Sequence, residues 1–162
     1  MEPVAPLGRE LAVALVDGRA DRRRLYGARD LDALGLSPRE AYAVACRNLS
    51  AIFRAGLDGR RVAGPRATKI LVLQHALAAS FLLLPNLARW ARRLLDTREP
   101  TLGASIPRHD MLVLYPDLGS HFREEIAGEL APRADPLTTE VFFLDVLQRP
   151  SMRRTSAIGL PA

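Results

Sequence analysis

The segment at residues 34–56 constrains the fold more than any other part of the sequence, which there reads LGLSPREAYAVACRNLSAIFRAG. Ser37 is a favourable N-cap, Pro38 falls at the first helical position, and Glu40 completes a capping box, so a helix is predicted to begin here. Its apolar residues recur at helical spacing: Ala41, Val44, Ala45, Leu49, Ile52 and Phe53. Gly56 is a typical helix end. Because the helix has one apolar stripe, that face must pack on another element, which we expect to be a sheet.

Short apolar runs predict strands before and after this helix. They occupy residues 11–16, 22–28, 60–64, 68–76, 102–106, 111–115 and 138–147. Turn signals separate neighbouring runs, such as Asp17-Gly18 after the first run and Gly64-Pro65-Arg66 between the third and the fourth. The first two runs therefore predict one hairpin, and the next two predict another.

Two further helices are predicted. The second runs from Ser80, a suitable N-cap, to about Leu95. Its buried stripe is predicted to comprise Leu83, Leu87, Trp90, Ala91 and Leu94. Because a proline inside a helix removes a hydrogen bond, the helix either tolerates Pro85 in its first turns or begins at Pro85. The third helix lies within residues 118–130, where apolar residues recur at a spacing of four.

The predicted elements follow the order β-β-α-β-β-α-β-β-α-β. Strand pairs separated by helices predict an α+β domain, with a mostly antiparallel sheet and about three helices packed on one face of it. A chain of 162 residues with 48% hydrophobic and 25% charged residues can bury one core. We therefore predict a single globular domain at residues 1–148, followed by a flexible tail at residues 149–162, where no periodicity remains.

The net charge of the chain is +5, but the distribution of that charge favours neither nucleic acid nor membrane as a partner. Lys69 is the only lysine, so the excess of arginine fits a coding bias as well as it fits a functional basic surface. Acidic residues are interspersed with the basic ones, and aromatic residues occupy core-like positions. Nucleic-acid binding is therefore not expected, whereas a small anionic ligand stays open.

Cysteine usage and the N-terminal residues bear on location. The single cysteine, Cys46, excludes an intramolecular disulfide and fits a reducing compartment. It lies in the apolar pattern of the first helix, which predicts a buried hydrophobic role. The first ten residues lack the features of a signal peptide, and no uninterrupted apolar run reaches the roughly 18 residues of a membrane helix. We expect a cytoplasmic protein with no membrane contact.

A compact polar group, PRHD, lies between two predicted strands. In a small hydrolase, His109 would act as a base and Asp110 would orient it, with Ser80 or Ser105 as nucleophile. In a purely structural role, Pro107 would fix the backbone of a turn and Asp110 would bond back to nearby amides. The nucleophile elbow GxSxG is missing, which favours the turn.

No cofactor and no metal are predicted. Neither a GxxxxGK[ST] phosphate loop nor a GxGxxG dinucleotide motif is present. The spacings of His75, His109 and His121 match no zinc signature, and one cysteine cannot build a thiolate site.

Asn48, Ser80 and Arg108 are the candidate ligand-binding residues. Asn48 lies beside the apolar stripe of the first helix, where an amide needs hydrogen-bond partners, so it either ties the helix to a neighbouring loop or lines a pocket. Arg108 can bind an anionic group. We expect a site in which Asn48, Ser80 and the turn at residues 107–110 come together.

Four segments carry a family resemblance. In chain order they are VACRNL, HALAASFLLL, ASIPRHDMLVLYPD and DPLTTEVFFL. Their order and spacing resemble an uncharacterised bacterial family, the domain of unknown function fourteen forty-four. The resemblance implies a helix that ends with the pair Asn48-Leu49, a second helix opened by Ser80, and a turn carried by Pro107 and Asp110.

The resemblance covers about residues 11–147. Members of the family extend further at the N-terminus, which implies that this chain corresponds to their C-terminal part. Members can also carry an imidazole directly after the proline, whereas this chain has Arg108 there and His109 follows. The family has no established activity, so the resemblance implies no particular reaction.

The sequence favours a non-enzymatic binding or protein-interaction domain over a small hydrolase that uses His109 and Asp110. The expected partner is another protein, a second copy of the chain or a small anion. A homodimer would form through the apolar second helix. The hydrolase would need His109 within hydrogen-bond reach of a serine and of its orienting carboxylate.

Overall fold

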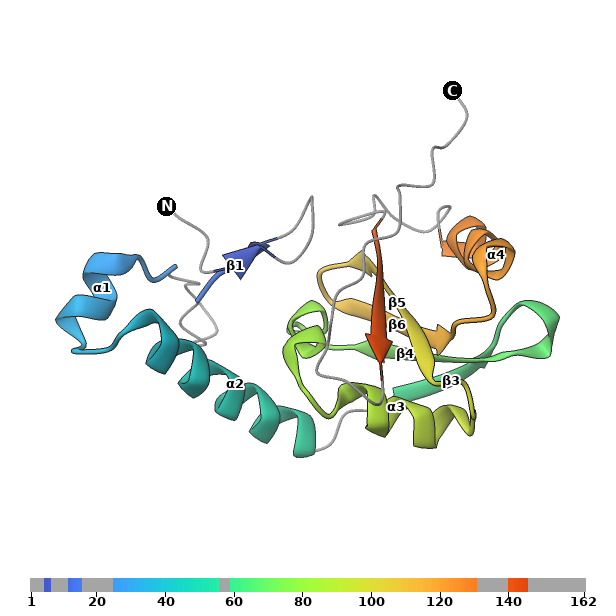
Figure 1. The fold of residues 1–162 in the computed structure, drawn as a ribbon, viewed down its shortest axis with the longest axis horizontal. Helices are drawn as coiled ribbons and strands as arrows, with labels where there is room; N and C mark the ends of the chain where they lie inside the picture. The colour runs from blue at the N-terminus through green and yellow to red at the C-terminus, as the bar shows by residue number, and fades with distance from the viewer. Residues whose placement is uncertain (1–4, 7–11, 16–24, 56–58, 131–139, 146–162) are drawn as a thin grey trace, which may run out of the picture. The chain divides into compact units, whose positions relative to one another are not determined.

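The computed structural model describes residues 5–6, 12–15, 25–55, 59–130 and 140–145. Contacts within the chain divide it into two compact units, Met1–Ala55 and Gly56–Ala162 (Figure 1). The single domain expected over residues 1–148 stays a prediction. The predicted tail at residues 149–162 lies outside the described residues.

The first unit contains two short strands and two helices. Strands β1 (Ala5–Pro6) and β2 (Ala12–Val13) pair antiparallel, and helices α1 (Ala28–Ala33) and α2 (Pro38–Arg54) follow. Buried Leu15, Leu31 and Ala41 form a cluster, and partly buried Tyr26, Leu36 and Ala45 pack against it. This small cluster is the described core of the unit.

The predicted hairpin between residues 11–16 and 22–28 is only partly present. Tyr26 N–H donates to the Leu15 carbonyl at 3.0 Å, which joins the ends of the two runs, while residues 16–24 lie outside the described part. Residues from Ala28 onward form α1 instead of a return strand. The sequence analysis missed this helix because its six residues bury only Leu31 and therefore show no apolar stripe.

Helix α2 confirms the helix predicted from residue 38 onward. Glu40 N–H donates to Ser37 Oγ at 3.3 Å, and Ser37 N–H donates to Glu40 Oε2 at 2.9 Å. These reciprocal bonds form the predicted capping box. At the other end Arg54 Nε donates to the Ser50 carbonyl at 3.1 Å. The helix ends at Arg54, and the predicted stop at Gly56 lies outside the described residues.

The second unit is built on a five-stranded sheet in which every neighbouring pair is antiparallel (Figure 1). The strands are β3 (Gly59–Ala63), β4 (Lys69–Gln74), β5 (Thr101–Arg108), β6 (Met111–Pro116) and β7 (Val141–Asp145). Their order across the sheet is β3-β4-β6-β5-β7. The predicted α+β class with an antiparallel sheet is therefore confirmed.

Helices α3 (Leu87–Leu95) and α4 (Ser120–Leu130) cover opposite faces of this sheet. On β4, Ile70 belongs to a cluster with Phe122 of α4, whereas a side chain placed on Gly59 would meet Leu71 and Trp90 of α3. Successive side chains of a strand point to opposite faces, so neighbouring positions 70 and 71 face different helices. The prediction that the helices share one face is wrong, because the central strands bury both of their faces.

The second helix begins later than predicted. Residues Ala79–Leu83 form a 3-10 helix, η2, and α3 begins only at Leu87, after Asn86 at the N-cap position. Pro85 lies at the break, where its ring and missing N–H prevent one continuous helix. Ser80 lies within η2, whose N-cap position is Ala78, so Ser80 is not the predicted N-cap.

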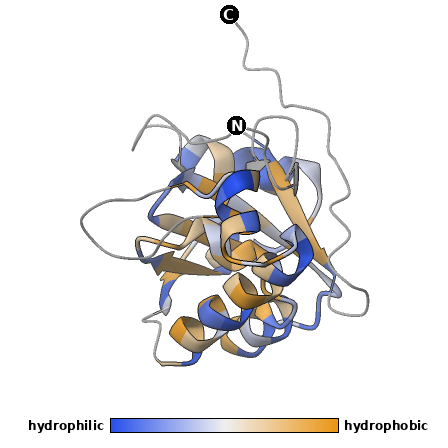
Figure 2. Cartoon of the chain, turned by 90° about the vertical axis from the view of Figure 1, so that its left-hand side faces the viewer, coloured by the Kyte–Doolittle hydropathy of each residue, from blue (hydrophilic) through white to orange (hydrophobic). Residues whose placement is uncertain are grey.

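The hydrophobic core lies between the central strands and the two helices. Its fully buried large side chains are Tyr115, Phe81, Phe122, Leu71, Leu73, Leu82, Leu87, Leu95, Leu102, Ile106, Leu112 and Leu114. Figure 2 shows hydrophobic stretches on the strands and both hydrophobic and hydrophilic residues on the helices. This core makes the sheet a rigid support for the turns at its edges.

Candidate functional site

The turn at residues 107–110 is closed by an arginine–carboxylate pair. Arg108 Nε donates to Asp110 Oδ1 at 2.9 Å, and Arg108 Nη2 donates to Asp110 Oδ2 at 2.6 Å. The hydrogen bond from the Arg108 guanidinium lowers the pKa of the Asp110 carboxyl below its usual value. Both of its oxygens bind Arg108, and a weaker backbone hydrogen bond from the Asp110 amide also lowers this pKa, in line with the predicted bond from the carboxylate back to a turn amide.

This pairing bears on the hydrolase hypothesis. His109 is exposed at the tip of the turn, and in the described part of the chain no hydrogen bond or ion pair joins it to Asp110. The hydroxyl of Ser105 lies 3.1 Å from the Tyr115 hydroxyl, with which it shares a hydrogen bond. The arrangement of base, orienting carboxylate and nucleophile that a hydrolase needs is therefore not formed by these groups.

The turn is bonded to the segment that follows β4. His75 N–H donates to the Asp110 carbonyl at 2.9 Å, and Ala79 N–H donates to the His109 carbonyl at 3.5 Å. These bonds place the backbone at residue 79, next to Ser80, against the turn. Ser80 itself is half-buried.

His75 has a structural role at this junction. Its Nδ1 accepts a hydrogen bond from Leu77 N–H at 3.0 Å, and its ring lies 5.4 Å from the Phe81 ring, centroid to centroid. The imidazole therefore stabilises the short turn that leads from β4 into η2.

Asn48 lies on α2, in the first unit, whereas Ser80 and Arg108 belong to the second unit. The Asn48 side chain is exposed, so water can bond its amide and no buried partner is needed. The expectation of an amide at the edge of a buried face is wrong for this residue. Cys46, predicted to be buried, is only half-buried.

A polar cluster lies where α4 meets the sheet. Arg123 Nη1 lies 2.6 Å from Asp117 Oδ1, and its guanidinium carbon lies 5.2 Å from the centroid of the Phe143 ring. Below them, burial raises the pKa of Tyr115 to about 12. A phenol held neutral by burial is a poor base, so we assign this cluster to attachment of the helix.

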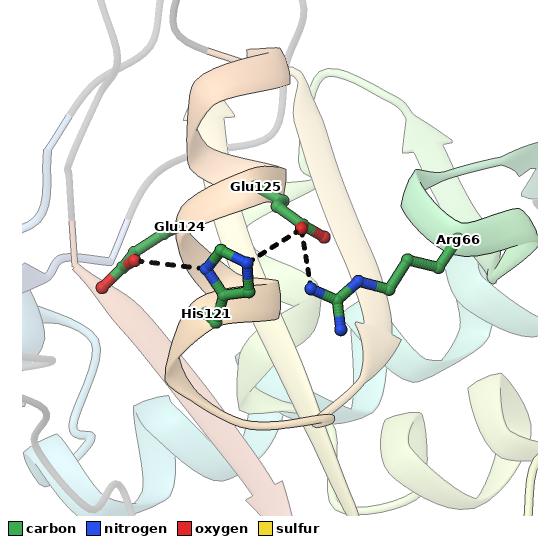
Figure 3. Close-up of polar contacts among 4 residues, drawn as sticks. All are labelled: Arg66, His121, Glu124 and Glu125. Carbon is green, nitrogen blue, oxygen red and sulfur yellow. Dashed lines mark hydrogen bonds and ion pairs between the residues drawn. The ribbon is translucent and has the colours of Figure 1, made fainter.

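A second polar cluster joins the β3–β4 hairpin to α4 (Figure 3). Arg66 Nη2 donates to Glu125 Oε1 at 2.8 Å, and the same oxygen lies 3.3 Å from His121 Nε2. His121 Nδ1 lies 3.8 Å from Glu124 Oε2. Within the described residues no group of three or more His, Cys, Asp and Glu side chains is arranged to hold a metal ion. The cluster therefore fixes the hairpin on the helix.

The hairpin turn held in this way has an unusual backbone. Arg66 and Ala67 adopt φ angles of 56° and 58°, and Thr68 N–H donates to the Pro65 carbonyl at 3.0 Å. Two successive left-handed residues correspond to a type I′ turn, which usually contains Asn and Gly. The ion pair from Arg66 helps to hold this costly conformation in place.

An open hollow of about 320 Å³ lies beside this turn. It is lined by Arg61, Val62 and Ala63 of β3 and by Ala67, Thr68 and Lys69 at the start of β4, and we call this set the basic hollow. Arg61 makes no ion pair with the described residues, and Lys69 Nζ lies 3.4 Å from Asp96 Oδ2 in an exposed pair. Residues 59–74 include no acidic residue.

The sequence pattern alone did not bring Lys69 together with Arg61. Strand pairing does so, because Ala63 is the register partner of Lys69 and Arg61 is that of Leu71. The turn signal at residues 64–66 could have revealed this, since a short loop places the residues before and after it side by side.

In the part of the chain that the structure describes, no helix combines the length and hydrophobicity needed to cross a bilayer. In three comparisons with known proteins, no protein-family model, no curated protein and no solved structure matches this chain.

Proposed function

We propose that this protein is a non-enzymatic binding domain that takes an anionic group of its partner in the basic hollow. The observation that carries the proposal is the position of Arg61, an exposed cation on the wall of the hollow that is in no ion pair with the described residues. Lys69 supplies a second cation across the hairpin.

The charges around the hollow favour an anion. The side chains of Lys69 and Asp96 are 52% and 84% exposed, so their ion pair is weak and an incoming anion can replace Asp96. Arg66 is already bound to Glu125, and this bond holds the hairpin on α4. Because the hollow is already formed, this chain itself loses little conformational freedom when an anion binds.

The proposal moves the anion site away from Arg108. Both Nε and Nη2 of that guanidinium donate to Asp110, so an anion would have to displace a charged partner held by two bonds. Arg61 has no such competitor among the described residues. Arg108 therefore serves as a matched control for Arg61.

We propose a non-enzymatic domain because candidate catalytic side chains are already hydrogen-bonded to other residues. Asp110 binds Arg108 and Ser105 shares a hydrogen bond with Tyr115, and in the described part of the chain neither side chain makes a hydrogen bond with His109. The single cysteine supports the proposed cytoplasmic location. The bacterial family resemblance stays a prediction.

Anion binding can be tested by titrating inorganic phosphate and, separately, a short glutamate-rich peptide while the melting temperature is followed. We expect both to stabilise the wild-type protein at low salt. In the double variant Arg61→Ala, Lys69→Ala, the loss of two exposed charge contacts should weaken binding by roughly two- to thirty-fold. Arg108→Ala and Arg89→Ala, which also remove exposed arginines, should bind as the wild type does. Equal binding by the double variant and the wild type, or no binding at all, would contradict the proposal.

A further inference from the structure

Strand β3 forms one edge of the sheet, with β4 as its neighbour in the described sheet. In an antiparallel pair, residues alternate between those whose N–H and C=O point to the partner and those whose groups point away. Gly64 N–H donates to the Thr68 carbonyl at 2.7 Å, so the even-numbered residues of this segment face β4. The backbone groups of Gly59, Arg61 and Ala63 therefore point outward.

The opposite side of β4 gives an independent check. His75 N–H donates to the Asp110 carbonyl at 2.9 Å, in line with the register that pairs Leu73 with Leu112 on β6. Odd-numbered residues of β4 thus bond to β6, and the backbone groups of the even-numbered residues of β4 bond to β3. Both bonds assign the same outward set to β3, and this set can pair with a further strand.

The basic hollow lies along this edge. Arg61, Val62 and Ala63 line it, and Arg61 and Ala63 are among the residues whose backbone groups point outward. Cross-strand partners share a face of the sheet, so Arg61 lies on the face of Leu71 and Ala63 on that of Lys69. A residue of an added strand that stands opposite Arg61 would lie on this same face beside Arg61, and the residue opposite Ala63 would face Lys69 across β3.

From this arrangement we infer that the partner is an extended acidic segment of another protein, which adds as a strand along β3 and places alternate Asp or Glu side chains at the basic hollow. This inference rests on the proposed function and deepens it. Backbone bonds at Arg61 and Ala63 supply the pairing, and each opposite-charge pair across the strands should strengthen binding by about 1.4- to 5-fold.

The positive charge of this edge also disfavours pairing between the β3 strands of two copies of the chain. Two β3 edges that paired with each other would bring Arg60 and Arg61 of one copy close to the same arginines of the other. Like charges opposite each other destabilise a sheet, and charged edges are a common protection against self-association. The same charges attract an acidic strand.

Strand addition can be measured on the unchanged protein by amide hydrogen exchange. The probe is a synthetic peptide in which Glu alternates with Val. On binding, we expect exchange at the outward amides of Arg61 and Ala63 to slow at least tenfold. Exchange at Val62, whose amide already faces β4, should change much less. Light scattering without peptide should show a monomer, and self-association that protects the same amides would overturn the inference.

Backbone methylation of the peptide tests the pairing itself. Two isomeric peptides carry N-methyl groups either on the Glu residues or on the Val residues. Because a strand pairs through one edge, one isomer should lose about thirtyfold or more in affinity, as expected for two or more lost hydrogen bonds, while the other should bind like the parent. Equal affinities of the two isomers would show that no strand is added.

The outcomes separate the inference from the proposed function. If the peptide and phosphate bind in a manner that depends on Arg61 and Lys69, but the outward amides stay unprotected, the anion site stands and strand addition is wrong. If neither ligand binds, both ideas are wrong. A peptide in which Lys alternates with Val should bind only the double variant Arg61→Glu, Lys69→Glu. This reversal tests the charge preference of the site.

Discussion

Arg123 of α4 and Asp117, three residues before that helix, form an ion pair with 2.6 Å between Nη1 and Oδ1, and their side chains are only 16% and 17% exposed. Asp117 Oδ1 also accepts a hydrogen bond from Gly119 N–H at 3.3 Å, and the Arg123 guanidinium lies over the ring of Phe143 on β7. One arginine thus links the entry to α4 with an edge strand of the sheet.

Replacing Arg123 by Met should lower the free energy of unfolding by about 1–3 kcal/mol, because Asp117 would keep its charge in a largely buried position without its partner. Urea denaturation measures the change. The control is Asp96→Asn, which removes the charge from the exposed pair with Lys69 and should alter stability by less than about 0.5 kcal/mol. Equal losses in the two variants would contradict a special role for Arg123.

Gly103 allows the Tyr115 ring to lie against the backbone of β5. A Cβ on Gly103 would clash with Cε2 of that ring, and Tyr115 is fully buried and cannot move aside. Gly103→Ala should therefore cost about 1–3 kcal/mol of stability. Gly128→Ala is the matched control: a Cβ there meets nothing within 4 Å, and Ala suits α4 better than Gly by about 0.5–1 kcal/mol. Chemical denaturation should give opposite signs for the two.

The alkaline stability of the protein should depend on Tyr115. Burial raises its pKa from 10.0 to about 12. The unfolded chain then releases this proton at lower pH than the folded chain. The contribution of the neutral Tyr115 phenol to the free energy of unfolding is therefore fully present below pH 10 and is lost as the pH rises to about 12. The loss is about 2–3 kcal/mol.

Tyr115→Phe checks this assignment. The variant should start less stable by about 1 kcal/mol, because it loses the bond to Ser105, but it should lack the extra decline between pH 10 and pH 12. Urea titrations at both pH values measure the difference. Identical slopes for variant and wild type would assign the alkaline loss to other groups.

The hairpin turn should be easier to form with glycine at residue 67. Ala67 has a φ of 58°, a conformation that costs an L-residue about 1–2 kcal/mol, so Ala67→Gly should raise stability by up to about 1 kcal/mol. Ala127→Gly, on the exposed surface of α4, should instead lower it by about 0.5–1 kcal/mol. Thermal unfolding of both variants tests the contrast. A lower stability of Ala67→Gly than of the wild type would mean that the turn is not strained.

Local signals in the sequence predicted most of the elements. The helix at Ser37, Pro38 and Glu40 was predicted correctly because a capping box is complete within four residues. Pro85 marked the correct place for a break, although the start of α3 at Leu87 was not chosen. Helix α1 was missed because a six-residue helix with one buried side chain has no period to detect.

The arrangement of the elements was harder to predict, although one signal was present. The run Ile70, Leu71, Val72, Leu73 is continuously apolar, which is typical of a strand covered on both faces, but helices on one face only were predicted. By contrast, Arg66 and Glu125 are 59 positions apart, so only the folded chain brings them together.

The candidate site could be predicted only in part. Backbone bonds join residues 75 and 79 to the turn at 109–110, while a site shared by Ser80 and that turn stays a prediction. The partner of the Asp110 carboxylate was not predicted, because a side chain two residues away competes with the turn amides on nearly equal terms and only the geometry decides between them.

The strand order β3-β4-β6-β5-β7 also has a consequence for how the sheet assembles. The pairs β3–β4 and β5–β6 are hairpins of neighbouring segments, whereas β4 meets β6 through pairs such as Leu73 with Leu112, which are distant in the sequence. Closing the long loop between them carries the larger entropic cost. We therefore expect the two hairpins to form early and the meeting of β4 with β6 to set the folding rate.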